Sequence, residues 1–182
     1  AIGAGVYQVS LLIDTIIASL LPAGSISYLF FADRVNQLPL GVVGVAVGTA
    51  LLPLMSRQLR SGDEAAATAS QNRAIEFSLF LTLPAAVALV VIAEPIISVL
   101  FERGAFDATS VKATAGALAI YATGLPAYVL VKALAPGYFA REDTVTPVKI
   151  AVFALAVNLV LNLILMGPFK HLGIAMATSV SA

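Results

Sequence analysis

An adjacent acid and base, Asp33 and Arg34, interrupt the apolar stretch 27–41. On a helix, Asp33 shares a face with Asn36 and Gln37, whereas Arg34 points about 100° away. The planar guanidinium of Arg34 suits phosphate oxygens if the side chain faces a cavity. The alternative is an arginine that extends to a membrane surface beside its local acidic partner. The residues alone leave both interpretations open.

A second set of polar residues could hold a cation. Asp14 lies about twelve residues into an apolar run, where a carboxylate is costly and becomes a functional candidate. Asn158 and Asn162 share a helical face because they are four residues apart, and the Thr178 hydroxyl and Ile174 carbonyl could add oxygens. Such a set suits a small hard cation such as sodium. The alternative is hydrogen bonding between helices, with Asp14 protonated.

Lys132 is the last charged candidate. It could contact an anionic substrate from a cavity, or its ammonium could extend to the surface near Arg141. Motifs of the GxSxG, HExxH and Walker types are missing from the sequence, so we expect no catalytic residues and no enzyme activity. The chain has no Cys and one His, which excludes thiolate and multi-histidine metal sites within it.

The composition indicates a membrane protein. The 182 residues are 60% hydrophobic and only 11% charged, with a mean hydropathy of +0.99. Soluble domains average about 45–50% apolar and about 25% charged residues. Ten basic and ten acidic residues cancel, so the charge gives no support for nucleic-acid binding.

The apolar runs predict an all-α, polytopic transmembrane helix bundle. We expect five spans and the start of a sixth, at about 2–21, 25–59, 64–101, 108–139, 147–166 and 172–182, the last one truncated. The second span is too long for a ~30 Å hydrocarbon core, so Pro39 and Gly41 should kink or divide it. Ser61 to Glu64 has the pattern of a capping box, and Thr146-Pro147 that of a cap followed by proline.

The ends of the chain and its basic residues predict its setting. It begins without Met inside one apolar run and stops inside another, so we expect a piece of a larger polytopic protein. Basic residues are more frequent in the second-to-third and fourth-to-fifth connections than on the opposite side, which predicts that those connections are cytoplasmic. The basic residues on that side are Arg57, Arg60, Arg73, Arg141 and Lys149.

Three segments carry a resemblance to a known family. They are DTIIASLLPAGSISYLFFADRVNQLPLGVVGVAVGTALLPLMSR at 14–57, VLVKALAPGYFAREDTVTPVKIA at 129–151 and GPFKHLG at 167–173. Together they resemble part of the second lobe of the bacterial lipid II flippases, the MurJ/MviN family. That family belongs to the multidrug/oligosaccharidyl-lipid/polysaccharide exporter superfamily. The resemblance implies a multi-pass protein of the bacterial cytoplasmic (inner) membrane that moves an undecaprenyl-diphosphate-linked peptidoglycan precursor to the outer leaflet by alternating access.

The resemblance also implies roles for individual residues. It matches Arg34 to a cavity arginine with Asp33 beside it, and it makes Asp14, Asn158, Asn162 and Thr178 look like a sodium site of some members. Asparagine also occurs at the Asp14 position in the family, so sodium and the membrane potential both stay open as the coupling force. The implied partners are lipid II, membrane lipids and the absent first lobe. The alternatives are another exporter of the superfamily, for drugs or polyprenyl-linked glycans, and a non-transporting membrane scaffold.

Overall fold

The computed structural model describes residue 12 and residues 15–182, and every regular element within them is a helix. Four apolar helical stretches within the described residues are long enough to cross a membrane, which confirms the predicted all-α membrane bundle. The first stretch, Ser25–Arg60, combines three elements, and the described residues also include two shorter helices and a helical segment at 15–19. The elements are α2 (Ser25–Pro39), the π-helix η1 (Leu40–Val45), α3 (Ala46–Arg60), α4 (Glu64–Val91), α5 (Ala93–Phe101), α6 (Ala108–Ala140), α7 (Val145–Phe169) and α8 (His171–Val180).

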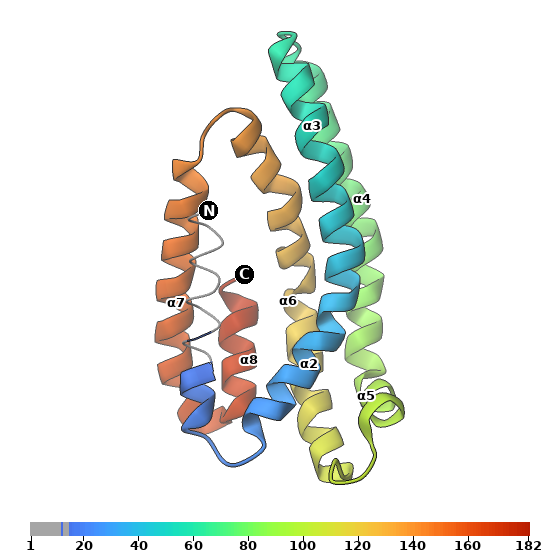
Figure 1. Ribbon diagram of the computed structural model, residues 1–182, viewed down its shortest axis with the longest axis vertical. Helices are drawn as coiled ribbons and strands as arrows, with labels where there is room; N and C mark the ends of the chain where they lie inside the picture. Colours follow the sequence, from blue (N-terminus) through green and yellow to red (C-terminus); the bar gives the residue numbers. More distant parts are fainter. Residues whose placement is uncertain (1–11, 13–14) are drawn as a thin grey trace.

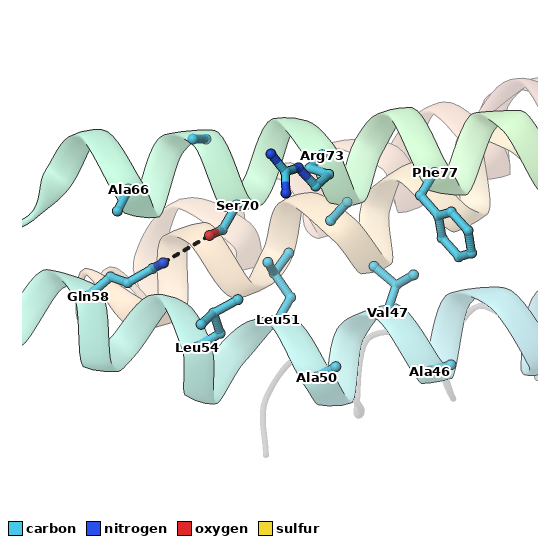
Figure 2. Close-up of a pocket in the computed structure, with 12 residues that line it drawn as sticks. Ala46, Val47, Ala50, Leu51, Leu54, Gln58, Ala66, Ser70, Arg73 and Phe77 are labelled. Carbon is cyan, nitrogen blue, oxygen red and sulfur yellow. Dashed lines mark hydrogen bonds between the residues drawn. The ribbon is translucent and has the colours of Figure 1, made fainter.

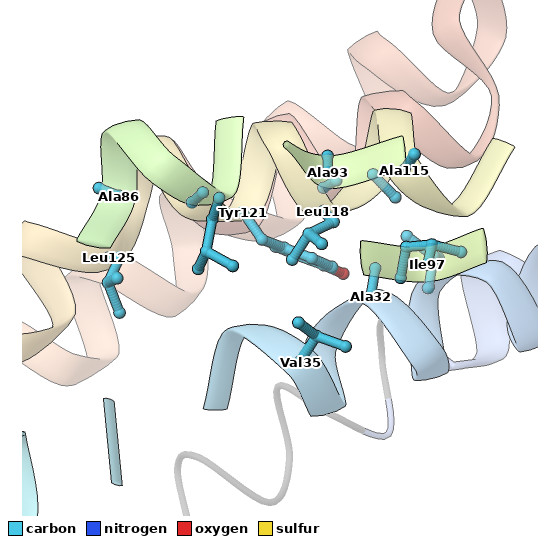
Figure 3. Packing of buried hydrophobic residues seen from close by; sticks show 14 of the residues in the cluster. Ala32, Val35, Ala86, Ala93, Ile97, Ala115, Leu118, Tyr121 and Leu125 are labelled. Atoms are coloured by element: carbon cyan, nitrogen blue, oxygen red, sulfur yellow. The ribbon is translucent and has the colours of Figure 1, made fainter. Parts of the chain in front are cut away.

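Helix α6 lies at the centre of the arrangement (Figure 1). It packs against α2, α3, α4 and α5 on one side and against α8 on the other, and α7 contacts mainly α8. Its buried side chains include small residues, such as Ala115, and two leucines, Leu118 and Leu125 (Figure 3). Small residues let helix backbones approach closely, which is the usual basis of helix association in a membrane.

Pro39 changes the helix type instead of ending the helix. Proline has no N–H to donate, and its ring clashes with the carbonyl four residues earlier. The six residues after Pro39, Leu40–Val45, adopt π-helical hydrogen bonding, and regular α-helix resumes at Ala46. The expected disruption at Pro39 and Gly41 is therefore a π-helical segment within one continuous helix.

The predicted span 64–101 consists of two helices in the structure. Helix α4 ends at Val91, Ile92 leaves the helical conformation with φ −111° and ψ 25°, and α5 starts at Ala93. Pro95 is then the third residue of α5, where an N–H has no partner within the helix. The chain thus places the proline where its missing donor costs least.

Both predicted helix caps are also replaced by neighbouring aspartates. The Asp63 carboxylate accepts from the Ala66 N–H at 2.9 Å, so Asp63 and not Ser61 caps α4. The Asp143 carboxylate accepts from the N–H groups of Val145 at 3.0 Å and Thr146 at 2.9 Å. Helix α7 consequently starts two residues before the predicted start at 147.

Candidate functional site

The segment that carries Arg34 contains a chain of polar contacts along α2. The Gln37 side-chain amide donates to the Asp33 carboxylate, while its carbonyl oxygen accepts from Arg34 Nη1 at 3.5 Å. Gln37 therefore links the acid to the base on one helical turn. The Arg34 guanidinium also lies over the Phe30 ring, with its carbon 4.8 Å from the ring centroid.

This arrangement leaves Arg34 able to bind an anion. The side chain is exposed, whereas Asp33 and Gln37 are half-buried. One long contact to a neutral amide uses little of the capacity of a guanidinium, which carries five N–H donors. Gln37, itself bound to Asp33, contacts the base from one side, and Phe30 supports it from another.

Lys132 lies on α6 beside the glycines of the Gly44/Gly48 pair. A methyl group added at Gly44 would lie 3.2 Å from Lys132 Cγ, and one added at Gly48 would lie 3.4 Å from the Lys132 carbonyl oxygen. The aliphatic part of Lys132 therefore packs closely against Gly44, whereas a Cβ at Gly48 would make only an ordinary contact with the Lys132 backbone. The residue as a whole is exposed.

Arg34 and Lys132 do not meet at one point of the fold. Gly44 lies next to Lys132 and is ten residues from Arg34, which corresponds to roughly 15 Å along a helix. The two cations are therefore separate contacts on either side of the π-helical segment. A single small ion could not bind both, although an extended anionic molecule could.

The two asparagines predicted on one face are buried where α7 packs against α8. Asn162 Nδ2 donates to Asn158 Oδ1 at 2.9 Å, and Asn158 Nδ2 donates to Ser181 Oγ at 3.3 Å. On α8, the Thr178 hydroxyl donates to the Ile174 carbonyl at 2.8 Å. The described members of the predicted cation set thus lie on two adjoining helices.

Two further residues join this cluster, and sequence reasoning missed them. The Tyr128 hydroxyl of α6 donates to the Thr178 carbonyl at 2.8 Å, and the Ser181 hydroxyl donates to the same carbonyl at 3.2 Å. Neither has a local sequence signal, because Tyr128 is fifty residues from its partner and Ser181 lies just beyond α8. Asp14, the predicted carboxylate of the set, lies outside the described residues.

Carboxylates outside the spans stabilise helix starts. Asp107 accepts from both the N–H and the hydroxyl of Ser110, each at 2.9 Å, and these hydrogen bonds hold the pKa of its carboxyl below the usual value. Hydrogen bonds from Thr146, and then from the Val145 N–H, lower the pKa of Asp143 in the same way. Their geometry assigns them to capping and leaves the substrate roles to other residues.

A family comparison decides what kind of bundle this is. The family model described as "Lipid II flippase MurJ" matches residues 1–182. The chain belongs to this family. It is 53% identical over 181 residues to the probable lipid II flippase MurJ of Rhizobium meliloti (strain 1021) and 39% identical over 177 residues to the lipid II flippase MurJ of Burkholderia cenocepacia. These matches cover 100% and 97% of this chain, and each covers 34% of the relative. The chain therefore spans about a third of the length of the curated relatives it matches.

Solved structures agree with this assignment. A lipid II flippase MurJ in an inward closed conformation superposes with a TM-score of 0.87 at 33% identity, covering 97% of this chain and 37% of that one. An outward-facing multidrug resistance transporter of the MATE family superposes equally well, with a TM-score of 0.87 over 99% of this chain and 39% of its own. At 18% identity, that second likeness shows the fold alone. This member of the MurJ family is thus a multi-pass membrane protein.

Proposed function

We propose that the flippase to which this sequence belongs moves lipid II, the undecaprenyl-diphosphate-linked peptidoglycan precursor, from the inner to the outer leaflet of the bacterial cytoplasmic membrane. The match of the MurJ family model to residues 1–182 carries this proposal. The process is binding and conformational change without covalent chemistry. It requires a first lobe that alternates with this one in exposing a central cavity to each side.

Arg34 is the residue we assign to the substrate's diphosphate. A guanidinium donates to phosphate oxygens in a planar, charge-assisted geometry that a lysine cannot reproduce. Gln37 positions this group and joins it to Asp33, whose charge offsets that of the arginine when the cavity is empty. Lys132, roughly 15 Å away along the helix, is assigned to a second anionic group of the same extended head group.

The test of this assignment is complementation in cells depleted of their own flippase. Arg34→Ala in the full-length protein should reduce lipid II transport roughly ten- to hundredfold, the worth of a hydrogen bond to a charged group. Arg34→Lys should restore transport only in part. Gln37→Leu should cause a smaller loss, because it removes the positioning contact and leaves the guanidinium in place.

Arg103 provides a matched control. It is an exposed arginine that donates to the Leu100 carbonyl at the end of α5. Arg103→Ala therefore removes the same charge as Arg34→Ala, but at a site without an assigned role. Normal growth of cells with a well-expressed Arg34→Ala protein would refute the assignment of Arg34. Equal losses for Arg34→Ala and Arg103→Ala would indicate a general charge effect instead.

We also propose that the α7–α8 cluster, together with Asp14, holds the coupling ion. Support comes from the chemistry of the described donors, since Asn158 Oδ1, the Thr178 hydroxyl and the Ile174 carbonyl are neutral oxygens of the kind that sodium accepts. Bound sodium would neutralise the Asp14 carboxylate and draw the helices together. Binding that favours one conformation over the other would bias transport.

This second proposal has a readout that is independent of transport. Sodium chloride should raise the melting temperature of the purified flippase more than choline chloride does. Thr178→Val should weaken the sodium effect, and Asp14→Ala should abolish it. An unchanged sodium response in Asp14→Ala would return Asp14 to helix packing and leave the membrane potential as the coupling force.

A further inference from the structure

A groove of about 600 Å³ lies between α3 and α4, and none of the residues discussed above as substrate or ion contacts lines it. Alanines on the two facing helices leave the space open, including Ala50 on α3 and Ala66 on α4 (Figure 2). Leu51, Leu54 and Phe77 supply most of the remaining apolar wall. The groove therefore offers a long, narrow apolar surface.

Arg73 gives this apolar groove one positive charge. Of the twelve residues that line it, all in the described part of the chain, Arg73 alone is charged. Side chains on a helix lean toward its N-terminus, and in Figure 2 the Arg73 nitrogens lie on the Ser70 side of the residue and not on the Phe77 side. The cation thus lies toward the α3–α4 turn, with apolar surface on the Phe77 side of it.

Contacts with α6 indicate the depth of this cation in the membrane. Gln71, two residues from Arg73, donates to the Leu134 carbonyl at 3.4 Å, and α6 ends one to two turns further on, at Ala140. Arg73 therefore lies near the end of a span, at the level of lipid head groups. From Ser70 to Phe77 the groove extends roughly 10 Å toward the bilayer centre, about two thirds of the ~15 Å depth of one leaflet.

We propose that this groove binds an acidic phospholipid of the leaflet at the Arg57 and Arg60 end of the bundle. One acyl chain lies along the alanine walls, and the phosphate contacts Arg73. Charge complementarity selects this occupant, because an apolar trough with a cation at the head-group level matches an acyl chain that ends in an anion. Arg57 and Arg60, exposed in the last turn of α3, lie outside the groove at the same end of the bundle and contribute only to the general surface potential there.

Tryptophan at position 77 makes the groove directly observable. The chain contains no Trp, and Phe77 is 56% exposed, so a larger ring should be tolerated there. In the full-length flippase, the fluorescence of Phe77→Trp minus that of the parent protein reports on position 77. Vesicles would contain phosphatidylglycerol or phosphatidylcholine with brominated acyl chains, which quench a tryptophan on contact. Phe80→Trp is the matched control, because Phe80 is 75% exposed but does not line the groove. We expect stronger quenching by phosphatidylglycerol at position 77 and equal quenching by both lipids at position 80.

The preference for the acidic lipid should depend on one arginine. Arg73→Gln in the Phe77→Trp protein should reduce it about fivefold, the factor for one basic residue near an anionic membrane surface. Arg60→Gln should leave it within about twofold, since Arg60 does not line the groove. Ala50→Leu, which fills the groove, should reduce quenching by both lipids, whereas Ala65→Leu on the exposed surface of α4 should not.

Three results would overturn the proposal. Equal quenching by the two lipids at position 77 would mean that the groove has no preference for charge. Equal effects of Arg73→Gln and Arg60→Gln would assign the preference to the general surface potential. Quenching at position 77 that neither Ala50→Leu nor Arg73→Gln alters would show that another segment of the flippase occupies the groove. None of these measurements depends on lipid II transport.

Discussion

Gly124 allows the packing of α8 against α6 to be tested by the addition of a single methyl group. A Cβ at this position would lie 3.0 Å from both Cα and Cβ of Ser179 and 3.2 Å from its carbonyl oxygen. Ordinary carbon–carbon contacts are about 3.5–4.0 Å. Gly124→Ala therefore requires α8 to move by about half an ångström or more, and overpacking of this kind costs about 1–3 kcal/mol.

Gly167 supplies the matched control. It is also helical, in α7, but a Cβ added there would have no neighbour within 4 Å. Gly124→Ala gains a helix propensity of about 1 kcal/mol, whereas Gly167→Ala gains less because Pro168 follows it, so the packing cost at Gly124 is the main difference expected between the two variants. Gly124→Ala should therefore be less stable than Gly167→Ala by about 1–3 kcal/mol.

The free energy of unfolding can be measured by titrating the purified full-length flippase from mild detergent into sodium dodecyl sulfate. Because α8 carries Ile174 and Thr178, Gly124→Ala should also weaken the stabilisation by sodium, whereas Gly167→Ala should not. Equal unfolding free energies for the two variants would refute the inferred contact between Gly124 and Ser179. If the two variants differ in stability but respond equally to sodium, the contact between Gly124 and Ser179 exists but does not affect the proposed ion site.

Three further predictions concern two helix caps and one hydrogen bond between helices. Hydrogen bonds lower the pKa of Asp107 in the folded protein. Their stabilisation is therefore complete above the ordinary carboxyl pKa of about 3.9 and is lost as the pH falls through the folded pKa. Between neutral and acidic pH, the melting temperature of Asp107→Asn should fall less than that of the parent protein. Asp63→Ala should cost about 1 kcal/mol in the detergent titration, and a larger loss from Ser61→Ala would contradict the observed cap. Tyr128→Phe should cost about 1 kcal/mol, and an unchanged stability would mean that the hydrogen bond to the Thr178 carbonyl contributes nothing.

Composition was sufficient to predict the long helices because membrane insertion depends on averages over about 20 residues. Helix ends depend on single side chains, and there the sequence was ambiguous. Ser61 and Asp63 both occur before the same apolar run, as do Asp143 and Thr146 before another, and Ser, Asp and Thr can all cap a helix. Only the backbone conformation decides between them. The break at Ile92 is similar, since Pro95 permits a new helix to start two residues earlier, at Ala93, without requiring one.

The candidate site was predictable in its residue types and not in its contacts. Asn158 and Asn162 could be paired because their spacing places them on one face whatever surrounds the helix. Tyr128 and Ser181 could not be found, because their relation to Thr178 exists only once α6 and α8 pack. The Gly44/Gly48 spacing likewise predicts a close helix crossing but does not name its partner, which is Lys132.

The π-helical segment connects three features that lie on one helix from Ser25 to Arg60. Each residue of an α-helix turns the chain by about 100°, so the wider π-helical hydrogen bonding shifts every later side chain around the axis relative to a continuous α-helix. Arg34 precedes this shift, the Gly44/Gly48 crossing lies at it, and the groove lined by Ala50 and Leu54 follows it. If residues 40–45 were α-helical and Arg34 kept its present direction, the glycines and the groove-lining residues of α3 would point in other directions. The π-helical segment after Pro39 therefore sets how Arg34, the crossing with α6 and the α3–α4 groove are oriented relative to one another.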